Sequence, residues 1–314
     1  MIGLLALAAI SDGWYHPAQT SLEVTQKVGH TLKREGLRDL SFRIVGPTKG
    51  GPYPLLVISH GMYGSETGLD PLVQYWASRG YVIIQPTHDD SLRYADAETR
   101  RKAFSGSLDN IASAPQRPKD IKLILDSLDE IAKLVPALSK RIDRTKLGMG
   151  GHSFGAWTTQ MVSGMSFRGA APNKDDRFQA FLVISPQGMG PGVNEASYKT
   201  MKGPMMMISG DKDAGRGFDD PKVYRRHAFD HAAPGDKSLV WLKDAAHNFG
   251  GINGQGARLI NPRNMDDNNP LHVRQVQSAS LAFWDATMKN SQEAKSYLAG
   301  KELEKTGGVK IELK

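Results

Sequence analysis

The feature that most constrains the fold of this 314-residue sequence is a succession of short apolar runs, each followed by Gly, Ser or a polar turn. Six of these runs predict buried strands: 53–61, 81–86, 146–151, 180–185, 204–210 and 238–245. Continuous apolar runs of this length are typical of strands covered on both faces, as in a parallel sheet. Helical patterns or long loops separate them, so the sequence predicts an α/β fold.

Two earlier segments, 21–28 and 37–45, alternate apolar and polar residues and predict an antiparallel start to the sheet. We therefore expect eight strands, most of them parallel, with helices on both sides. The clearest helical patterns cover 70–80, 118–135 and 272–289. The sequence thus places one large sheet and its helices in a single domain.

We predict domain limits of 21–290, with a leader over 1–20 and a C-terminal surface extension over 291–314 that holds a helix and a short strand. The leader contains Ala6-Leu7-Ala8, a cleavage-like pattern, but it lacks a basic start and is too short to span a bilayer. It is either a signal-peptide remnant or a disordered or surface-packed leader. The first alternative predicts a secreted or periplasmic protein, and the second a cytoplasmic one.

Composition excludes several kinds of function. The chain has no cysteine, which rules out disulfides, a thiol nucleophile and a cysteine metal site. The net charge of +7 is spread along the chain, as expected for a solvated surface and not for a nucleic-acid interface. No stretch predicts a membrane-spanning helix. We therefore expect a monomer without nucleic-acid or integral-membrane partners.

The stretch 151–155 reads Gly-His-Ser-Phe-Gly and lies between a predicted buried strand and a helix-forming segment. A tight strand-to-helix turn needs small residues on both sides of its central residue, and Gly151 and Gly155 supply them. Such a turn lifts the hydroxyl of Ser153 out of the sheet. This context predicts that Ser153 is a nucleophile; read without it, the five residues describe only a glycine-rich loop.

A serine hydroxyl needs a base and an orienting carboxylate. His247 follows the last predicted strand, where its imidazole would take the Ser153 proton. The turn after the seventh strand offers Asp211 and Asp213; the spacing from Gly210 favours Asp213, and Asp211 stays the alternative. Functional groups in parallel sheets collect at the carboxyl ends of the strands. The order Ser153, Asp213, His247 is the order expected of an α/β-hydrolase triad.

An oxyanion needs donors that are already in place. The N–H of Phe154 follows the nucleophile directly, and Met62 would give the second N–H from the loop after the third strand. The side chains of Tyr63 and Phe154 would then form part of an apolar acyl site. For His60, in the same loop, we expect a bracing hydrogen bond and no catalytic role.

The segments "PLLVISHGMYGS", "RGYVIIQPTHDDS", "GMGGHSFGAW", "SGDKDAG" and "AAHNF" resemble the α/β-hydrolase fold. Within it, they are similar to platelet-activating-factor acetylhydrolases, dienelactone-hydrolase-like esterases and cutinase-like polyester hydrolases. The resemblance spans about 37–290 and implies a Ser-Asp-His carboxylester hydrolase without metal or organic cofactor. It assigns Ser153, Asp213 and His247 to the triad, and Met62 and Phe154 to the oxyanion hole.

We expect four residues near Ser153 to bind substrate: Tyr63, Trp157, Gln187 and Met189. Gln187 stands where cutinase-like enzymes often have an aromatic residue, and the absent cysteines depart from them too. The motif at 87–91, Thr-His-Asp-Asp-Ser, is similar to a loop beside the active site of the acetylhydrolases, or is a turn held by its aspartates.

The predicted function is hydrolysis of small-molecule or polymeric esters through an acyl-enzyme on Ser153. The alternatives are a short-chain acyl esterase or lipase, an amidase or peptidase, and a non-catalytic binding protein. The polar segments 91–119 and 250–270 contain no clear lid helix, so we expect a partial rim over an open cleft.

Overall fold

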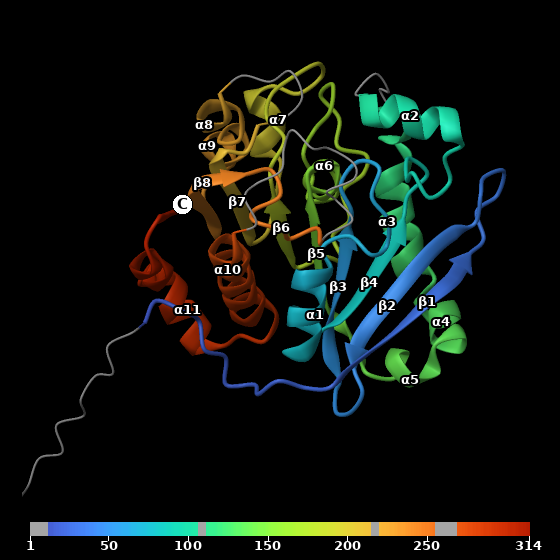
Figure 1. Ribbon diagram of the computed structural model, residues 1–314, viewed down its shortest axis with the longest axis horizontal. Helices are drawn as coiled ribbons and strands as arrows, with labels where there is room; N and C mark the ends of the chain where they lie inside the picture. Colours follow the sequence, from blue (N-terminus) through green and yellow to red (C-terminus); the bar gives the residue numbers. More distant parts are fainter. Residues whose placement is uncertain (1–11, 106–110, 215–219, 255–268) are drawn as a thin grey trace, which may run out of the picture.

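The computed structural model describes residues 12–105, 111–214, 220–254 and 269–314. Within them the chain forms a nine-stranded sheet with helices on both sides (Figure 1). The strand order is β1-β2-β4-β3-β5-β6-β7-β8-β9. The strands from β4 to β8 run parallel, whereas β1, β2 and β9 pair antiparallel with their neighbours. The predicted α/β class and the antiparallel start are confirmed.

All eight predicted strands are present with shifted ends. The strands are β1 (Val24–Leu32), β2 (Leu40–Pro47), β3 (Tyr53–Ser59), β4 (Val82–Thr87), β5 (Ile142–His152), β6 (Ala180–Ile184), β7 (Met205–Lys212), β8 (Lys237–Ala246) and β9 (Val309–Leu313). The predicted count of eight is wrong, because β9 joins the sheet beside β8 and buries Ile311. The predicted surface extension therefore completes one edge of the sheet.

The helices are α1 (Asp70–Ser78), α2 (Ala97–Ser105), α3 (Gln116–Asp126), α4 (Leu128–Leu134), α5 (Pro136–Ser139), α6 (Phe154–Val162), α7 (Glu195–Lys199), α8 (Pro221–Tyr224), α9 (His227–His231), α10 (Pro270–Met288) and α11 (Gln292–Ala299). Two short 3-10 helices, η1 (Ile111–Ser113) and η4 (Glu302–Thr306), complete the described elements. The helices predicted at 70–80 and 272–289 are confirmed as α1 and α10.

Two helix predictions need correction. The single helix expected over 118–135 is broken at Ser127, whose backbone (φ −102°, ψ 15°) leaves the helical region between α3 and α4. The segment 91–119, expected to be irregular, contains α2 and the first residues of α3. Few apolar residues mark α2. Two local features support it: Asp96 accepts from the N–H of Thr99 in the first turn, and Glu98 pairs with Lys102 one turn on.

The sheet is covered on both faces, and its strands divide their side chains between two cores. Leu56 and Ile58 of β3 point to the face covered by α1 and α10, where Trp76 and Trp284 meet edge to face. The alternate residues of the same strand point to the face covered by α3 to α6. Burial on both faces explains why the central strands are continuous apolar runs.

Among the helices of the described residues, none has the length and apolar character needed to cross a bilayer.

Candidate active site

The turn between β5 and α6 is built around Ser153. β5 ends at His152, α6 begins at Phe154, and Ser153 between them has φ 58° and ψ −116°. A positive φ in a residue with a side chain is strained, and strain of this kind is found at functional sites. A Cβ added to Gly151 would overlap the carbonyl group of Gly155, and one added to Gly155 would overlap the carbonyl oxygen of Ser59. Both glycines are therefore required by close backbone contacts.

Ser153, His247 and Asp213 form a hydrogen-bonded chain across the ends of β5, β7 and β8. The Oγ of Ser153 lies 2.9 Å from Nε2 of His247, and Nδ1 of that ring lies 2.7 Å from Oδ1 of Asp213. This geometry sets the imidazole tautomer: Nδ1–H donates to the carboxylate, and Nε2 is left to accept the serine proton. Residues 94 and 34 positions apart in the chain thus meet at one edge of the sheet.

Asp213 is fully buried, and it has partners besides His247. Burial alone would raise the pKa of its carboxyl, but the charge of Arg225 and the hydrogen bonds from His247 and Ser185 lower that pKa to about 2. Ser185 donates to the carboxylate at 2.7 Å, and Ser209 donates to Oδ2 at 2.8 Å. The carboxylate is thereby held ionised and fixed beside His247.

Asp211 lies elsewhere. Its Oδ1 accepts from Nε1 of Trp241 at 2.9 Å, and its Oδ2 accepts from the N–H of Asp244 at 3.2 Å. The carboxylate therefore braces the end of β8, and of the two alternatives left open by the sequence only Asp213 contacts His247.

His152, the residue before Ser153, supports the hydrogen-bonded chain by holding the backbone of His247. Its Nε2 lies 2.7 Å from the carbonyl oxygen of His247, and the two rings lie 4.6 Å apart. Asn253 donates to Nδ1 of His152 at 3.2 Å, so Nε2 carries the proton and donates to that carbonyl. Burial, followed by the proximity of His247, lowers the pKa of His152 to about 3. A neutral imidazole thus fixes the backbone of His247.

The loop after β3 runs beside Ser153, as the sequence predicts. A Cβ added to Gly61 would lie 3.6 Å from the Cβ of Ser153, which places the Gly61–Met62 peptide next to the hydroxyl. Within the described part of the chain, neither the N–H of Met62 nor that of Phe154 donates to another residue. Both are therefore available to a negatively charged oxygen formed beside Ser153.

The four residues suggested for substrate binding have different surroundings. Trp157 and Met189 are half-buried and pack on the helix-covered core beneath the site. Gln187 is held by its backbone against Gln160, and its Nε2 lies 3.5 Å from the carbonyl oxygen of Ser153. Tyr63 is only 4% exposed, so its ring is covered and presents little surface to a substrate.

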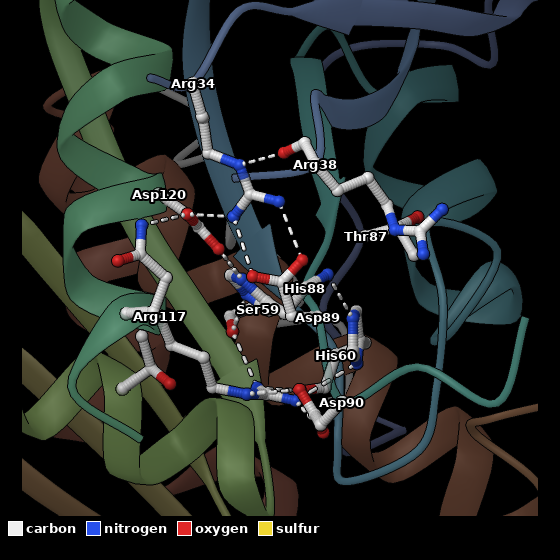
Figure 2. A network of polar contacts seen from close by, with 12 residues as sticks. Arg34, Arg38, Ser59, His60, Thr87, His88, Asp89, Asp90, Arg117 and Asp120 are labelled. Carbon is white, nitrogen blue, oxygen red and sulfur yellow. Dashed lines mark hydrogen bonds and ion pairs between the residues drawn. The ribbon is translucent and has the colours of Figure 1, made fainter. Parts of the chain in front are cut away.

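The motif at 87–91 lies in a network of charges next to this site, buried except at Asp89 (Figure 2). His88 pairs with Asp120, Asp89 with Arg34, and Asp90 with Arg117. The aspartates therefore contact arginines on other elements, and the turn itself is closed by a backbone hydrogen bond from Ser91 to His88. His60 contributes the bracing hydrogen bond expected of it, accepting from the N–H of His88 at 3.0 Å.

Sequence reasoning missed Ser185, Ser209, Arg225, Arg117 and the bracing role of His152. Ser185 directly follows the apolar run of β6, the position that marks functional groups in a parallel sheet, so its signal was present. The two arginines gave no such signal: Arg117 lies on α3 and Arg225 directly after α8, and only the tertiary fold brings them to the strand ends.

A scan against protein-family models finds no family that matches this chain. Across the residues that the structure describes, no group of three or more His, Asp and Glu side chains is arranged to hold a metal ion.

Proposed function

We propose that this protein is a serine carboxylester hydrolase with an α/β-hydrolase fold. The observation that carries the proposal is the continuous chain from a strained Ser153 through His247 to a buried, ionised Asp213. A structural serine needs neither a positive φ nor a histidine oriented by a carboxylate. The nearby Met62 and Phe154 N–H groups support the same reading.

In the proposed reaction, Oγ of Ser153 attacks the ester carbonyl carbon while Nε2 of His247 takes the hydroxyl proton. The carbonyl oxygen becomes negatively charged and accepts from the N–H groups of Met62 and Phe154. His247 then returns the proton to the alcohol as the C–O bond of the ester breaks. The acyl group remains on Ser153, and Asp213 stabilises the imidazolium formed in between.

The second half of the reaction repeats these steps with water in place of the alcohol. His247 takes a proton from water, the hydroxide attacks the acyl carbon, and the proton passes to Oγ of Ser153 as the carboxylic acid leaves. No cofactor is required by this sequence of steps. Small-molecule and polymeric esters both remain substrates under the proposal.

The proposal is tested by comparing wild type with Ser153→Ala on p-nitrophenyl esters, a phthalate diester and a polyester film. Loss of the nucleophile should lower kcat by at least about 10³-fold, because nucleophile removal in such chains costs many orders of magnitude. A fluorophosphonate probe should label wild type at Ser153 and leave the variant unlabelled. The matched control is Ser163→Ala, since Ser163 follows α6 and its hydroxyl donates to the carbonyl oxygen of Gln160.

Retention of a tenth or more of wild-type activity in Ser153→Ala would refute the assignment of the nucleophile. A wild-type protein that turns over no ester and takes up no probe would refute the enzyme itself and favour a binding protein.

A further inference from the structure

Arg117 and Asp90 form a fully buried ion pair beside the candidate active site. Arg117 lies on α3 and Asp90 in the loop after β4, and the guanidinium contacts the carboxylate through Nε at 3.0 Å and Nη2 at 2.8 Å. Neither side chain is exposed. A two-pronged pair of this kind fixes direction as well as distance, since the guanidinium is planar and its donors are rigid.

The same guanidinium holds the loop that carries Met62. Figure 2 shows the Arg117 guanidinium beside His60 and Asp90. Its Nη1 donates to the carbonyl oxygen of His60 at 2.7 Å, and its Nη2 donates to that of Gly61 at 3.2 Å. Nδ1 of His60 donates to the carbonyl oxygen of Gly61 as well, at 2.6 Å. On the other side of Met62, the N–H of Tyr63 donates to Oδ2 of Asp90 at 3.1 Å. The two neighbours of Met62 are therefore hydrogen-bonded to the same ion pair, Gly61 to Arg117 and Tyr63 to Asp90.

The Gly61 carbonyl and the Met62 N–H belong to the same planar peptide unit and point in opposite directions. Hydrogen bonds that fix the direction of the Gly61 carbonyl therefore also fix the direction of the Met62 N–H. Two donors on that carbonyl, one of them cationic, also polarise the peptide and strengthen its N–H as a donor. Tyr63 follows with φ 66°, a strained backbone that persists only where its surroundings impose it.

Arg117 also contacts the residue that carries the second N–H. Its Cζ lies 4.3 Å from the centre of the Phe154 ring, in cation–π contact with the residue after Ser153. One side chain thus contacts Phe154 and the peptide of Met62 together.

We infer that Arg117, supported by Asp90, is a positioning residue that aligns the Met62 and Phe154 N–H groups for the negative charge formed on the ester oxygen. The inference rests on the proposed function of the site. Arg117 itself touches no reacting atom; it acts through the Gly61–Met62 peptide and the Phe154 ring. Its removal should therefore lower kcat and leave ester binding in the ground state largely unchanged.

The first test is Arg117→Lys. Lysine keeps a cation beside Asp90 but lacks the planar set of N–H donors that reaches the carbonyl oxygens of both His60 and Gly61. With a p-nitrophenyl ester, kcat should fall by about 10²-fold, the scale of a misplaced or lost oxyanion donor, while KM changes less than threefold. The affinity for a trifluoromethyl ketone, which forms a charged tetrahedral adduct on Ser153, should weaken in parallel. If Arg117 served folding alone, the variant would show a lower melting temperature without a selective fall in kcat at nearly constant KM.

A second variant, Arg117→Met combined with Asp90→Asn, removes both charges and leaves no unpaired buried ion. It should show the same loss of kcat and of ketone affinity. The matched control is Arg34→Lys, since Arg34 is a buried arginine of the same network that pairs with Asp89 and Asp120 and does not contact residues 60–63. Its kcat should stay within threefold of wild type. All rates are measured at a temperature at which circular dichroism shows every variant folded.

The outcomes separate the two claims. If wild type hydrolyses esters and the Arg117 variants keep kcat within threefold of wild type, the positioning role is overturned and the proposed esterase function is supported. An equal loss in Arg34→Lys would also overturn it, since the effect would then belong to the network as a whole. If wild type hydrolyses no ester, the proposed function is wrong and the positioning role is overturned with it.

Discussion

Asp211 and Asp213 are two positions apart in sequence and differ completely in environment. Asp211 lies near the surface and accepts from Trp241 and Asp244, whereas Asp213 is buried against His247, Ser185 and Arg225. In an extended strand, residues two positions apart point to the same side. The difference therefore comes from the turn at the end of β7, where the N–H of Asp213 donates to the carbonyl oxygen of Gly210 and the chain changes direction.

At the residue scale we predict that Asp213→Asn lowers kcat for ester hydrolysis by about 10³- to 10⁴-fold. The amide cannot stabilise the imidazolium and can impose the wrong tautomer on His247. Steady-state kinetics at pH 8 measure the effect.

Asp211→Asn is the matched control, because it changes the same group two residues earlier in the chain. Its kcat should stay within about threefold of wild type. The reverse result, a severe loss in Asp211→Asn and a mild one in Asp213→Asn, would show that the carboxylates exchange roles in the working enzyme.

At the scale of elements, the contact of α6 with β3 decides where Ser153 sits. The helix begins one residue after Ser153, and its second residue, Gly155, lies against the carbonyl of Ser59 at the end of β3. No side chain fits between these two backbones. The loop that carries Met62 starts at the same point, so the helix, the strand and the loop share one set of close contacts.

We therefore predict that Gly155→Ala lowers the free energy of unfolding by about 1–3 kcal/mol through overpacking. Ester turnover per folded molecule should fall as well, because the substitution displaces the backbone at Ser153. Chemical denaturation measures the first effect and active-site titration with a fluorophosphonate the second.

Gly190→Ala is the control, since a Cβ there would meet no atom within 4 Å. The free energy of unfolding should change by less than about 0.5 kcal/mol in this variant. A Gly155→Ala protein as stable and active as Gly190→Ala would disprove the backbone contact.

At the scale of the whole molecule, three histidines are buried in the polar layer at the strand ends. Burial, followed by nearby positive charge or a second histidine, lowers the pKa of His60, His88 and His152, the last to about 3. A histidine with a lowered pKa in the folded state takes up its proton on unfolding. The stability of the folded protein should therefore fall as the pH drops below about 6.5, the ordinary histidine pKa.

We predict that His152 alone contributes a slope of about 1.4 kcal/mol per pH unit to the free energy of unfolding between pH 5.5 and 4. Urea unfolding of wild type and His152→Gln across pH 8 to 4 should show the slope reduced by that amount in the variant.

Phe249→Leu is the matched control, because it removes an edge contact with the His152 ring and no titratable group. It should lower stability by a similar amount at every pH and keep the wild-type slope. Equal slopes in wild type and His152→Gln would contradict a neutral, buried His152.

The sequence by itself determined the α/β class, the strand positions, the tight turn at Ser153 and the placement of His247 after β8. These follow from local rules: apolar runs form buried strands, and small residues permit a sharp strand-to-helix turn. It also predicted that the loop with Met62 faces Ser153, because the ends of parallel strands meet at one edge.

Only the tertiary structure decided between Asp211 and Asp213, brought Arg225 and Arg117 to the site, and joined β9 to the sheet. The physical reason is distance along the chain. Each of these contacts joins elements whose relative position depends on packing of the whole core. A lone arginine has the same local sequence whether it faces water or a buried carboxylate. The break at Ser127 belongs with them, since no Pro or Gly marks it.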